Sequence, residues 1–232
     1  MINRNKEPAI ISLETEKGSF VAEDYLVTME RRRATLIEIW LKEPVPIKTL
    51  AAVFITTLGR VSPICDARTI THAQIGANCH YVKAVGLSRL MLDRPFHKRI
   101  MQADHAGVLK EIASSFSFEF VDQSGFQSEA KDWVFLSSVR NAFDQIWDAY
   151  DITKERWHLD VIGKRLILLP EIIGDAVELN QEIIIEESED GVIYPIIPNL
   201  RPFVPVRHRE KDWIIDSVIL DGKRQRAKLK LA

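Results

Sequence analysis

The sequence predicts an α+β fold, with a helix-rich N-terminal two thirds and a C-terminal part rich in β-hairpins. Three observations predict it. Apolar residues recur at helical period in several segments before residue 152. From Trp157 onward, apolar and polar residues alternate as they do in half-buried strands. Turn dipeptides such as Asp221-Gly222 separate the alternating segments. We therefore place a helix-rich region at residues 1–152 and a hairpin-rich region at 153–232, which either form one domain or two.

The first elements follow from apolar period and from proline and glycine positions. We expect a strand at residues 9–14 and then a helix from Glu23 to Lys42, which Pro44 and Pro46 stop. A short apolar helix is expected over 47–58 and ends at Gly59. An extended segment follows from Arg60 to Ile70. Thr71 and Gln74 have capping-box spacing, which predicts a helix from Thr71 to about Leu92.

The next elements are two helices with a strand between them. Asp93 is a candidate N-cap with Pro95 in the first turn, and this helix runs to about Phe116. A short strand follows at residues 118–122. Apolar residues at helical spacing then form one stripe and predict a core-facing helix: Trp133, Leu136, Val139, Phe143, Ile146, Trp147 and Tyr150.

Three hairpins are expected in the remaining chain. The first covers 157–169, and the second joins 182–187 to 192–197 with Pro195 on an edge strand. The third flanks Asp221-Gly222, and its last strand directs Ala227, Leu229 and Leu231 to one face and Lys228 and Lys230 to the other.

Composition restricts the class of protein. The chain has 232 residues, 46% hydrophobic and 28% charged, with a formal net charge of -2. These values are ordinary for a globular fold and predict no long-range attraction to nucleic acid or membrane. No apolar run approaches the roughly 20 residues that cross a bilayer, and no signal-peptide pattern follows Met1. We expect a cytoplasmic protein that binds no membrane.

Motifs of cofactor and hydrolase chemistry are missing from the sequence. It contains no G-x-G-x-x-G, Walker A, G-x-S-x-G or H-E-x-x-H pattern, so we expect no cofactor, no metal and no enzyme activity. Cys65 and Cys79 lack further ligands nearby and are expected to be structural thiols. His72 and His80 lie eight residues apart, about 12 Å along a predicted helix, which is too far for one metal.

One enzyme pattern remains as an alternative. Asp122 ends an apolar strand, and Glu129 and Lys131 follow it. These residue types resemble the site of PD-(D/E)xK nucleases, in which two carboxylates hold Mg²⁺ and a lysine orients the attacking water. Here Glu129 and Lys131 precede the Trp133 stripe, so the same letters are also explained as the first turn of a helix.

Charge is segregated near the C-terminus. Residues 171–190 contain eight acidic residues and no Lys or Arg, whereas Lys223, Arg224, Arg226, Lys228 and Lys230 occur without acids in the last eleven residues. A basic hairpin is one way to contact DNA phosphates. Two alternatives stay open: lysines that protect a sheet edge, and contact with the acidic segment, within the chain or in a partner.

A short stretch of the chain carries a family resemblance. Residues 60–120 read as strand, capped helix and second helix, the order of a ribbon-helix-helix unit. The letters Tyr81-Val82-Lys83-Ala84-Val85, followed by Leu92-Asp93-Arg94, resemble the AcaB-like family of plasmid and integrating-conjugative-element proteins. That family includes transcriptional activators of conjugation genes. A second strand-helix candidate, Lys164–Pro170 followed by Glu171–Asn180, has an acidic helix that would repel DNA.

The resemblance implies a DNA-binding regulator of transcription on a conjugative plasmid or integrating element, acting as a homodimer on double-stranded DNA. Arg60 and Arg68 would contact DNA from the ribbon, and Thr71 would hold a phosphate. The full set of expected DNA-binding residues is Arg60, Arg68, Thr69, Thr71, Lys83, Arg224, Arg226, Lys228 and Lys230. The main alternative is a non-enzymatic protein-interaction or assembly protein; a metal-dependent nuclease is the further alternative.

Overall fold

A computed structural model of the chain describes residues 8–30, 34–150, 157–160, 165–168, 177–189, 191–197, 200–202 and 204–232. The chain divides into two compact units. The first, here called the sheet unit, combines Met1–Leu87 with Gly174–Ala232. The second, here called the inserted unit, comprises Ser88–Ile173. The predicted boundary at residues 152 and 153 falls inside the inserted unit.

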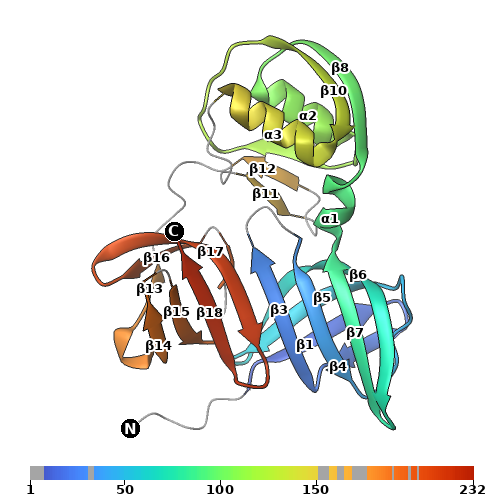
Figure 1. Ribbon diagram of the computed structural model, residues 1–232, viewed down its shortest axis with the longest axis vertical. Helices are drawn as coiled ribbons and strands as arrows, with labels where there is room; N and C mark the ends of the chain where they lie inside the picture. The colour runs from blue at the N-terminus through green and yellow to red at the C-terminus, as the bar shows by residue number, and fades with distance from the viewer. Residues whose placement is uncertain are drawn as a thin grey trace. The chain divides into compact units, whose positions relative to one another are not determined.

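The sheet unit is built on one large sheet (Figure 1). Its strands are β1 (Ile10–Thr15), β2 (Gly18–Val21), β3 (Asp24–Glu30), β4 (Leu36–Leu41), β5 (Leu50–Thr57), β6 (Arg60–Gly76), β7 (Cys79–Gly86), β13 (Val177–Glu178), β14 (Glu186–Ser188), β15 (Gly191–Pro195), β16 (Pro205–His208), β17 (Lys211–Asp221) and β18 (Arg226–Leu231). A single 3₁₀ turn, η1 (Gln181–Ile183), lies between β13 and β14. The main path runs β14-β15-β18-β17-β3-β4-β7-β6-β5-β1-β2.

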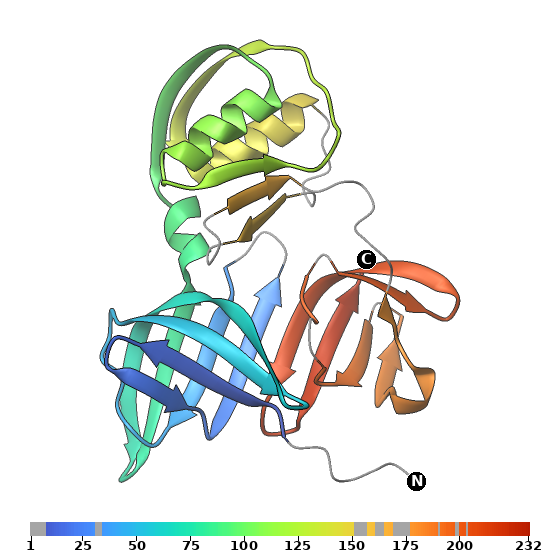
Figure 2. The same ribbon diagram turned by 180° about the vertical axis from the view of Figure 1, so that it is seen from behind.

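The two sequence segments of the sheet unit join through the pairing of β17 with β3. Ser217 to Asp221 lie antiparallel to Glu30 to Leu26. The start of the chain is also tied to this junction, because Gln225 in the β17–β18 turn bonds both the N–H and the carbonyl oxygen of Ala9. Figure 2 shows the same sheet from behind, with the blue N-terminal strands beside the red C-terminal ones. One continuous hydrophobic core spans both segments.

Strand alternation in β3 and β4 explains why residues 23–42 are not a helix. Tyr25, Val27 and Met29 are buried, and their neighbours are only half-buried; β4 repeats the pattern at Ile37, Ile39 and Leu41. Side chains two apart share one face of a strand, so this burial requires strands. The predicted helix over 23–42 is wrong. The residues that suggested helical period included Leu26, Leu36 and Trp40, which lie on the opposite, half-buried face.

Two further helix predictions in the sheet unit are wrong. Residues 47–58 contain β5, with Ala51, Val53 and Ile55 buried at alternate positions. The predicted helix from Thr71 to Leu92 is replaced by the end of β6, by β7 and by the short helix α1 (Leu87–Leu92). Thr71 and Gln74 do not cap a helix, because they pair across the hairpin with Lys83 and His80.

The inserted unit contains helices and two small sheets. Its elements after α1 are β8 (Pro95–Ala103), α2 (His105–Ser114), β9 (Glu119–Asp122), β10 (Lys131–Ser138), α3 (Val139–Tyr150), β11 (Trp157–Asp160) and β12 (Arg165–Leu168). β8 pairs with β10, while β12 lies between β9, to which it is parallel, and β11. α2 contacts strands of both sheets, and α3 packs on β8 and β10. A separate core results.

The apolar stripe of the inserted unit is split between a strand and a helix. Val139, Phe143, Ile146 and Trp147 are buried on α3 as the helical period predicts. The preceding residues belong to β10, where Trp133 and Phe135 are buried but Leu136 is 76% exposed. The segment 93–116 is also divided, into β8 and α2. Asp104, not Asp93, caps α2, since its carboxylate accepts the N–H of Gly107 at 2.7 Å.

The C-terminal hairpins are confirmed, but the predicted fold class is wrong. β1, β9, the β11–β12 hairpin, the β14–β15 hairpin and the β17–β18 hairpin occur close to the expected residues. The expected placement of Pro195 on an edge strand is wrong, because β15 lies between β14 and β18. Lys228 and Lys230 point outward from β18 while Ala227, Leu229 and Leu231 are buried. The described residues are nevertheless mostly strand, with strands throughout the region predicted to be helix-rich. Among these residues, no helix has the length and apolarity needed to cross a membrane.

Candidate functional site

Thr69 is the most deeply buried of the residues predicted to bind DNA. It is fully buried, and its hydroxyl donates to the carbonyl oxygen of Pro46 at 2.6 Å and accepts the N–H of Thr49 at 2.9 Å. These bonds hold the segment before β5 against β6. Thr69 therefore has a structural role.

Arg60 is exposed at the start of β6, and Arg68 is half-buried between Leu50 and Val85 on the neighbouring strands.

Thr71 and Lys83 lie opposite each other on β6 and β7. The ammonium of Lys83 is 3.9 Å from the carboxylate of Glu38, which also accepts the hydroxyl of Tyr81 at 2.5 Å. Trp40 packs against Tyr81 with ring centroids 5.4 Å apart. Lys83 thus belongs to a half-buried cluster of strand side chains.

The basic C-terminal residues face acids on the adjacent strand. Arg224 and Arg226 each lie 3.8 Å from the carboxylate of Asp221, and Lys230 lies 3.7 Å from that of Asp216. These residues lie together on the β17–β18 hairpin, whereas Arg60, Arg68, Thr69 and Thr71 lie on β6. Asp216 and Asp221 therefore offset part of the positive charge that suggested DNA binding.

Glu187, one of the acids of the segment 171–190, has its partners on β16 and the turn after it. Glu187 on β14 accepts a hydrogen bond from His208 at 2.6 Å and pairs with Arg209 at 2.7 Å. The hydrogen bond from His208, more than the charge of Arg209, lowers the pKa of Glu187 below its ordinary value. His208 is 5% exposed. This pair joins the β14–β15 hairpin to β16.

The candidate nuclease residues of the inserted unit contact neighbouring protein groups, and the carbonyl oxygen of Glu129 accepts the hydroxyl of Tyr150 at 2.8 Å. The carboxylate of Asp122 accepts hydrogen bonds from the backbone and hydroxyl of Ser124. Lys131 starts β10, donates to the carbonyl oxygen of Ala149 at 3.1 Å and lies over the ring of Tyr150. No group of three or more His, Cys, Asp or Glu residues that would hold a metal is found among the residues that the structure describes.

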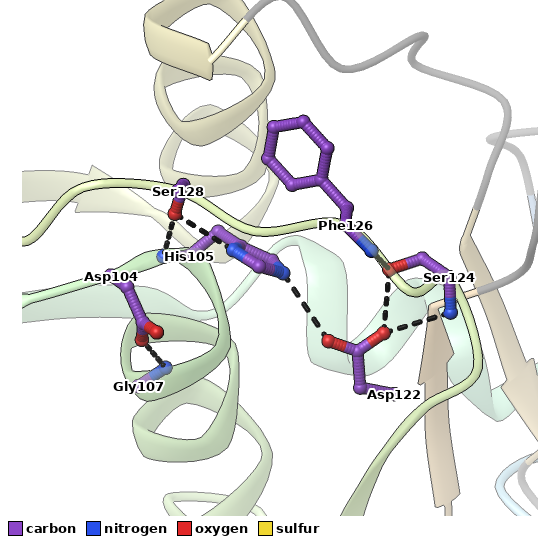
Figure 3. A network of polar contacts seen from close by, with 7 residues as sticks. All are labelled: Asp104, His105, Gly107, Asp122, Ser124, Phe126 and Ser128. Atoms are coloured by element: carbon purple, nitrogen blue, oxygen red, sulfur yellow. Dashed lines mark hydrogen bonds and ion pairs between the residues drawn. The ribbon is translucent and has the colours of Figure 1, made fainter.

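Asp122 instead belongs to a polar network around a buried histidine (Figure 3). His105, the first residue of α2, is 2% exposed. Its Nδ1 lies 2.8 Å from the hydroxyl of Ser128, and its Nε2 lies 3.3 Å from the carboxylate of Asp122. The backbone N–H of His105 also donates to the Ser128 hydroxyl oxygen at 3.0 Å. Phe126 packs its ring at the edge of the imidazole.

The hydrogen bonds of this network indicate that it anchors residues 123–128 to α2. The neutral tautomer that satisfies both sides has the Ser128 hydroxyl donating to Nδ1 and Nε2–H donating to Asp122. The Ser128 oxygen is then engaged twice, as donor to Nδ1 and as acceptor of the backbone N–H. His105 and Ser128 were missed in the sequence because their contact is 23 residues apart and follows no known spacing.

A second histidine pair lies at the β6–β7 hairpin. His72 and His80, which we placed about 12 Å apart on a helix, are in contact: His72 Nε2 lies 3.0 Å from His80 Nδ1, and the rings stack at 5.2 Å. One nitrogen of the pair accepts the hydrogen bond, so at least one ring is neutral. Cys65 and Cys79 are both free thiols, and burial raises the pKa of the Cys65 thiol to about 12.

Exposed apolar side chains occur on both units, and on the sheet unit they include Leu50 at 58% and Val61 at 66% exposure. On the face of the β8–β10 pair turned away from the helices, Met101, Val134 and Leu136 are 52%, 58% and 76% exposed. On the sheet unit, Ile70 and Ile75 of β6 are 48% and 58% exposed. Exposed apolar groups of this kind often mark protein contacts.

Solved phage tail proteins are similar in fold to nearly the whole chain. No family model and no curated protein matches the sequence. The 43 kDa tail protein of prophage MuSo2 from Shewanella oneidensis is similar in structure, with a TM-score of 0.70 and 6% identity, over 96% of this chain and 97% of that one. The tail protein from Neisseria meningitidis MC58 gives a TM-score of 0.74 and 8% identity, over 97% and 96%.

A type VI secretion protein shares the fold as well. The c3393 protein of E. coli, a component of that secretion system with structural similarity to the T4 tail proteins gp27 and gp5, gives a TM-score of 0.61 and 7% identity. The match covers 99% of this chain and 74% of that chain. At such low identities, these likenesses establish the fold.

The resemblance to the AcaB-like family is wrong. Residues 81–85 lie in β7, and Asp93 and Arg94 stand between α1 and β8 rather than before a helix. A ribbon-helix-helix unit needs one strand followed by two helices, whereas β6 pairs with β5 and β7 of its own chain. The interpretation as a homodimeric, DNA-binding regulator of conjugation is overturned by this fold and by its likeness to tail proteins.

Proposed function

We propose that this chain is a structural subunit of a phage-tail-like particle and acts by assembling with other proteins. One observation carries the proposal: two tail proteins superimpose on nearly the whole chain, and nearly the whole of each is covered in return. The match therefore includes the sheet unit and the inserted unit, and does not depend on one common subdomain. The non-enzymatic assembly protein kept as the alternative to a regulator corresponds to this proposal.

The surface of the inserted unit supports an assembly role. Val134 and Leu136 on β10 face outward beside Arg99 and His97 of β8, to which they are directly paired. A two-stranded pair with helices on one face leaves its other face open for contact. Met101 and Arg99 on the same face are of the residue types enriched at protein interfaces.

Sedimentation of a source-cell lysate tests the proposal. We expect an epitope-tagged chain to sediment with large particles that show tail-like shapes under the electron microscope, and affinity purification to recover the other proteins of the particle. A chain that remains in the low-mass fractions while tail-like particles sediment without it contradicts the proposal.

We also propose that the chain catalyses no reaction. The engagement of Asp122 with Ser124 and His105, and of Lys131 with Ala149, supports this. We predict that the purified chain does not cut duplex DNA with Mg²⁺ or Mn²⁺, measured by gel electrophoresis of a supercoiled plasmid. Cleavage that Glu129→Ala abolishes and Glu119→Ala leaves intact would refute the prediction.

The cellular location is part of the same proposal. We propose that the chain is made and assembled in the cytoplasm, as expected for a protein incorporated into a particle before release. Fractionation of cells collected before particle release measures this location directly. The tagged chain is expected with cytoplasmic markers, and its recovery with periplasmic or membrane markers contradicts the proposal.

A further inference from the structure

β6 changes its pairing partner halfway along its length. Arg60 to Arg68 pair with β5, and Ala67 to Gly76 pair with β7. Among the strands that the structure describes, residues 70–76 therefore pair only with β7, and their other side has no paired strand. We call residues 70–76 the open edge of β6; the strand is labelled in Figure 1.

The open edge carries neither charged residues nor proline. Residues 69–78 contain no Asp, Glu, Lys, Arg or Pro. The first half of the same strand, by contrast, contains Arg60, Pro63 and Asp66. Charged residues and proline are two of the devices by which exposed strand edges avoid unwanted partners. Their restriction to one half of β6 indicates that the other half is left available for a partner.

Two bulges add unpaired backbone and apolar surface to the open edge. Thr69 and Thr71 pair with consecutive residues of β7, so Ile70 is an extra residue; Ile75 is extra in the same way between Gln74 and Gly76. A bulged residue does not take part in the ladder. Both isoleucines are about half exposed, at 48% and 58%.

We propose that the open edge of β6 binds an extended, uncharged segment of a partner protein, which adds a strand to the sheet. This inference rests on the proposed assembly function. The chemistry of the occupant follows from the edge. Main-chain N–H and C=O groups supply the affinity of an added strand, and side chains directly opposite lie about 5 Å apart. β-branched and apolar side chains of the added strand can contact Ile70, Thr71, Ala73 and Ile75. An acidic or basic side chain of the added strand would find no Asp, Glu, Lys or Arg on the edge to pair with.

A peptide-binding measurement tests the edge on the full-length chain. The probe is a fluorescein-labelled, end-capped peptide with the sequence of residues 69–78, which itself has the predicted chemistry. We expect its fluorescence anisotropy to rise and saturate as the purified chain is added. The same peptide with N-methyl groups on alternate amides is expected not to bind, because it has lost donors to the edge.

Matched variants place the binding at the edge. Ile70→Lys/Ile75→Lys adds two charges at exposed positions and is expected to weaken peptide binding by at least about tenfold. Val61→Lys is the control, since Val61 is 66% exposed on the β5-paired half of the same strand. It should bind like the parent. Circular dichroism confirms that both variants are folded.

Each other outcome overturns the inference. Absent binding, equal binding by the N-methylated peptide, or undiminished binding by the double variant all exclude strand addition at this edge. Such failure is separate from failure of the assembly proposal, because the chain would still sediment with tail-like particles. A chain that binds the peptide but never enters a particle contradicts the assembly proposal alone.

Discussion

Buried and half-buried polar residues in this protein act as anchors between segments distant in the chain. Thr69 ties residues 46–49 to β6, and His105 ties residues 122–128 to α2. Gln225 ties Ala9 to the last hairpin across 216 residues. Buried hydroxyl, imidazole and amide groups need such partners, since an unsatisfied one costs about 1–3 kcal/mol. The sequence did not indicate these roles, because each partner is set by the tertiary fold.

Glu187 makes the stability of the sheet unit depend on acidity. Its folded-state pKa is lowered below the ordinary value of 4.5, first by the hydrogen bond from His208. A carboxylate of this kind contributes stability above its unfolded-state pKa, and the contribution is lost as pH falls through the folded-state pKa. We predict that the free energy of unfolding falls less steeply between about pH 5 and about pH 3 in Glu187→Gln than in the parent.

Urea unfolding at a series of pH values measures this slope. Glu186→Gln, on the same strand with an exposed side chain, is the control and should retain the parental slope. Equal slopes in the parent and in Glu187→Gln would show that the pair with His208 contributes nothing to folding.

At the scale of elements, hydrophobic period was ambiguous wherever both faces of a strand carried apolar side chains. Residues 24–30 and 36–41 have apolar residues on the buried and on the half-buried face, so helical spacings occur among them by chance. β18 was predicted correctly because its outward positions are lysines. The strand period could be recognised in β18 because one face is apolar and the other is charged, and not because of its apolar content.

The stripe from Trp133 to Tyr150 gives a direct test of element type. A helix through all of it would bury Leu136, whereas strand β10 buries Phe135 and exposes Leu136. We predict that Phe135→Ala lowers the free energy of unfolding by about 3–5 kcal/mol, and that Leu136→Ala changes it by no more than about 0.5 kcal/mol. Chemical denaturation of the two variants measures both values. A larger loss from Leu136→Ala would mean that residues 131–138 are not the strand described.

At the scale of the whole molecule, the decisive pairing joins residues that are far apart in sequence. β3 and β17 make the two segments of the sheet unit into one sheet, and the inserted unit occupies the chain between them. No local signal marks such a pairing. The sequence predicted the C-terminal hairpins individually but not their pairing with the N-terminal strands.

The candidate sites followed the same pattern. Arg224, Arg226, Lys228 and Lys230 were correctly expected on one hairpin. Their charge suggested DNA because Asp216 and Asp221, which lie beside several of them, belong to the preceding strand. The exposed apolar residues of β6 and β10 were not recognised, since exposure depends on which residues are strand and which edges are paired.

The proposed role of this chain as a structural subunit of a phage-tail-like particle can be tested by electron microscopy of source cells from which the gene has been deleted. We expect complete tail-like particles to disappear or to lack a defined part, and to return when the parental gene is supplied on a plasmid. Complete particles of normal shape and number in the deletion strain would contradict the proposed role.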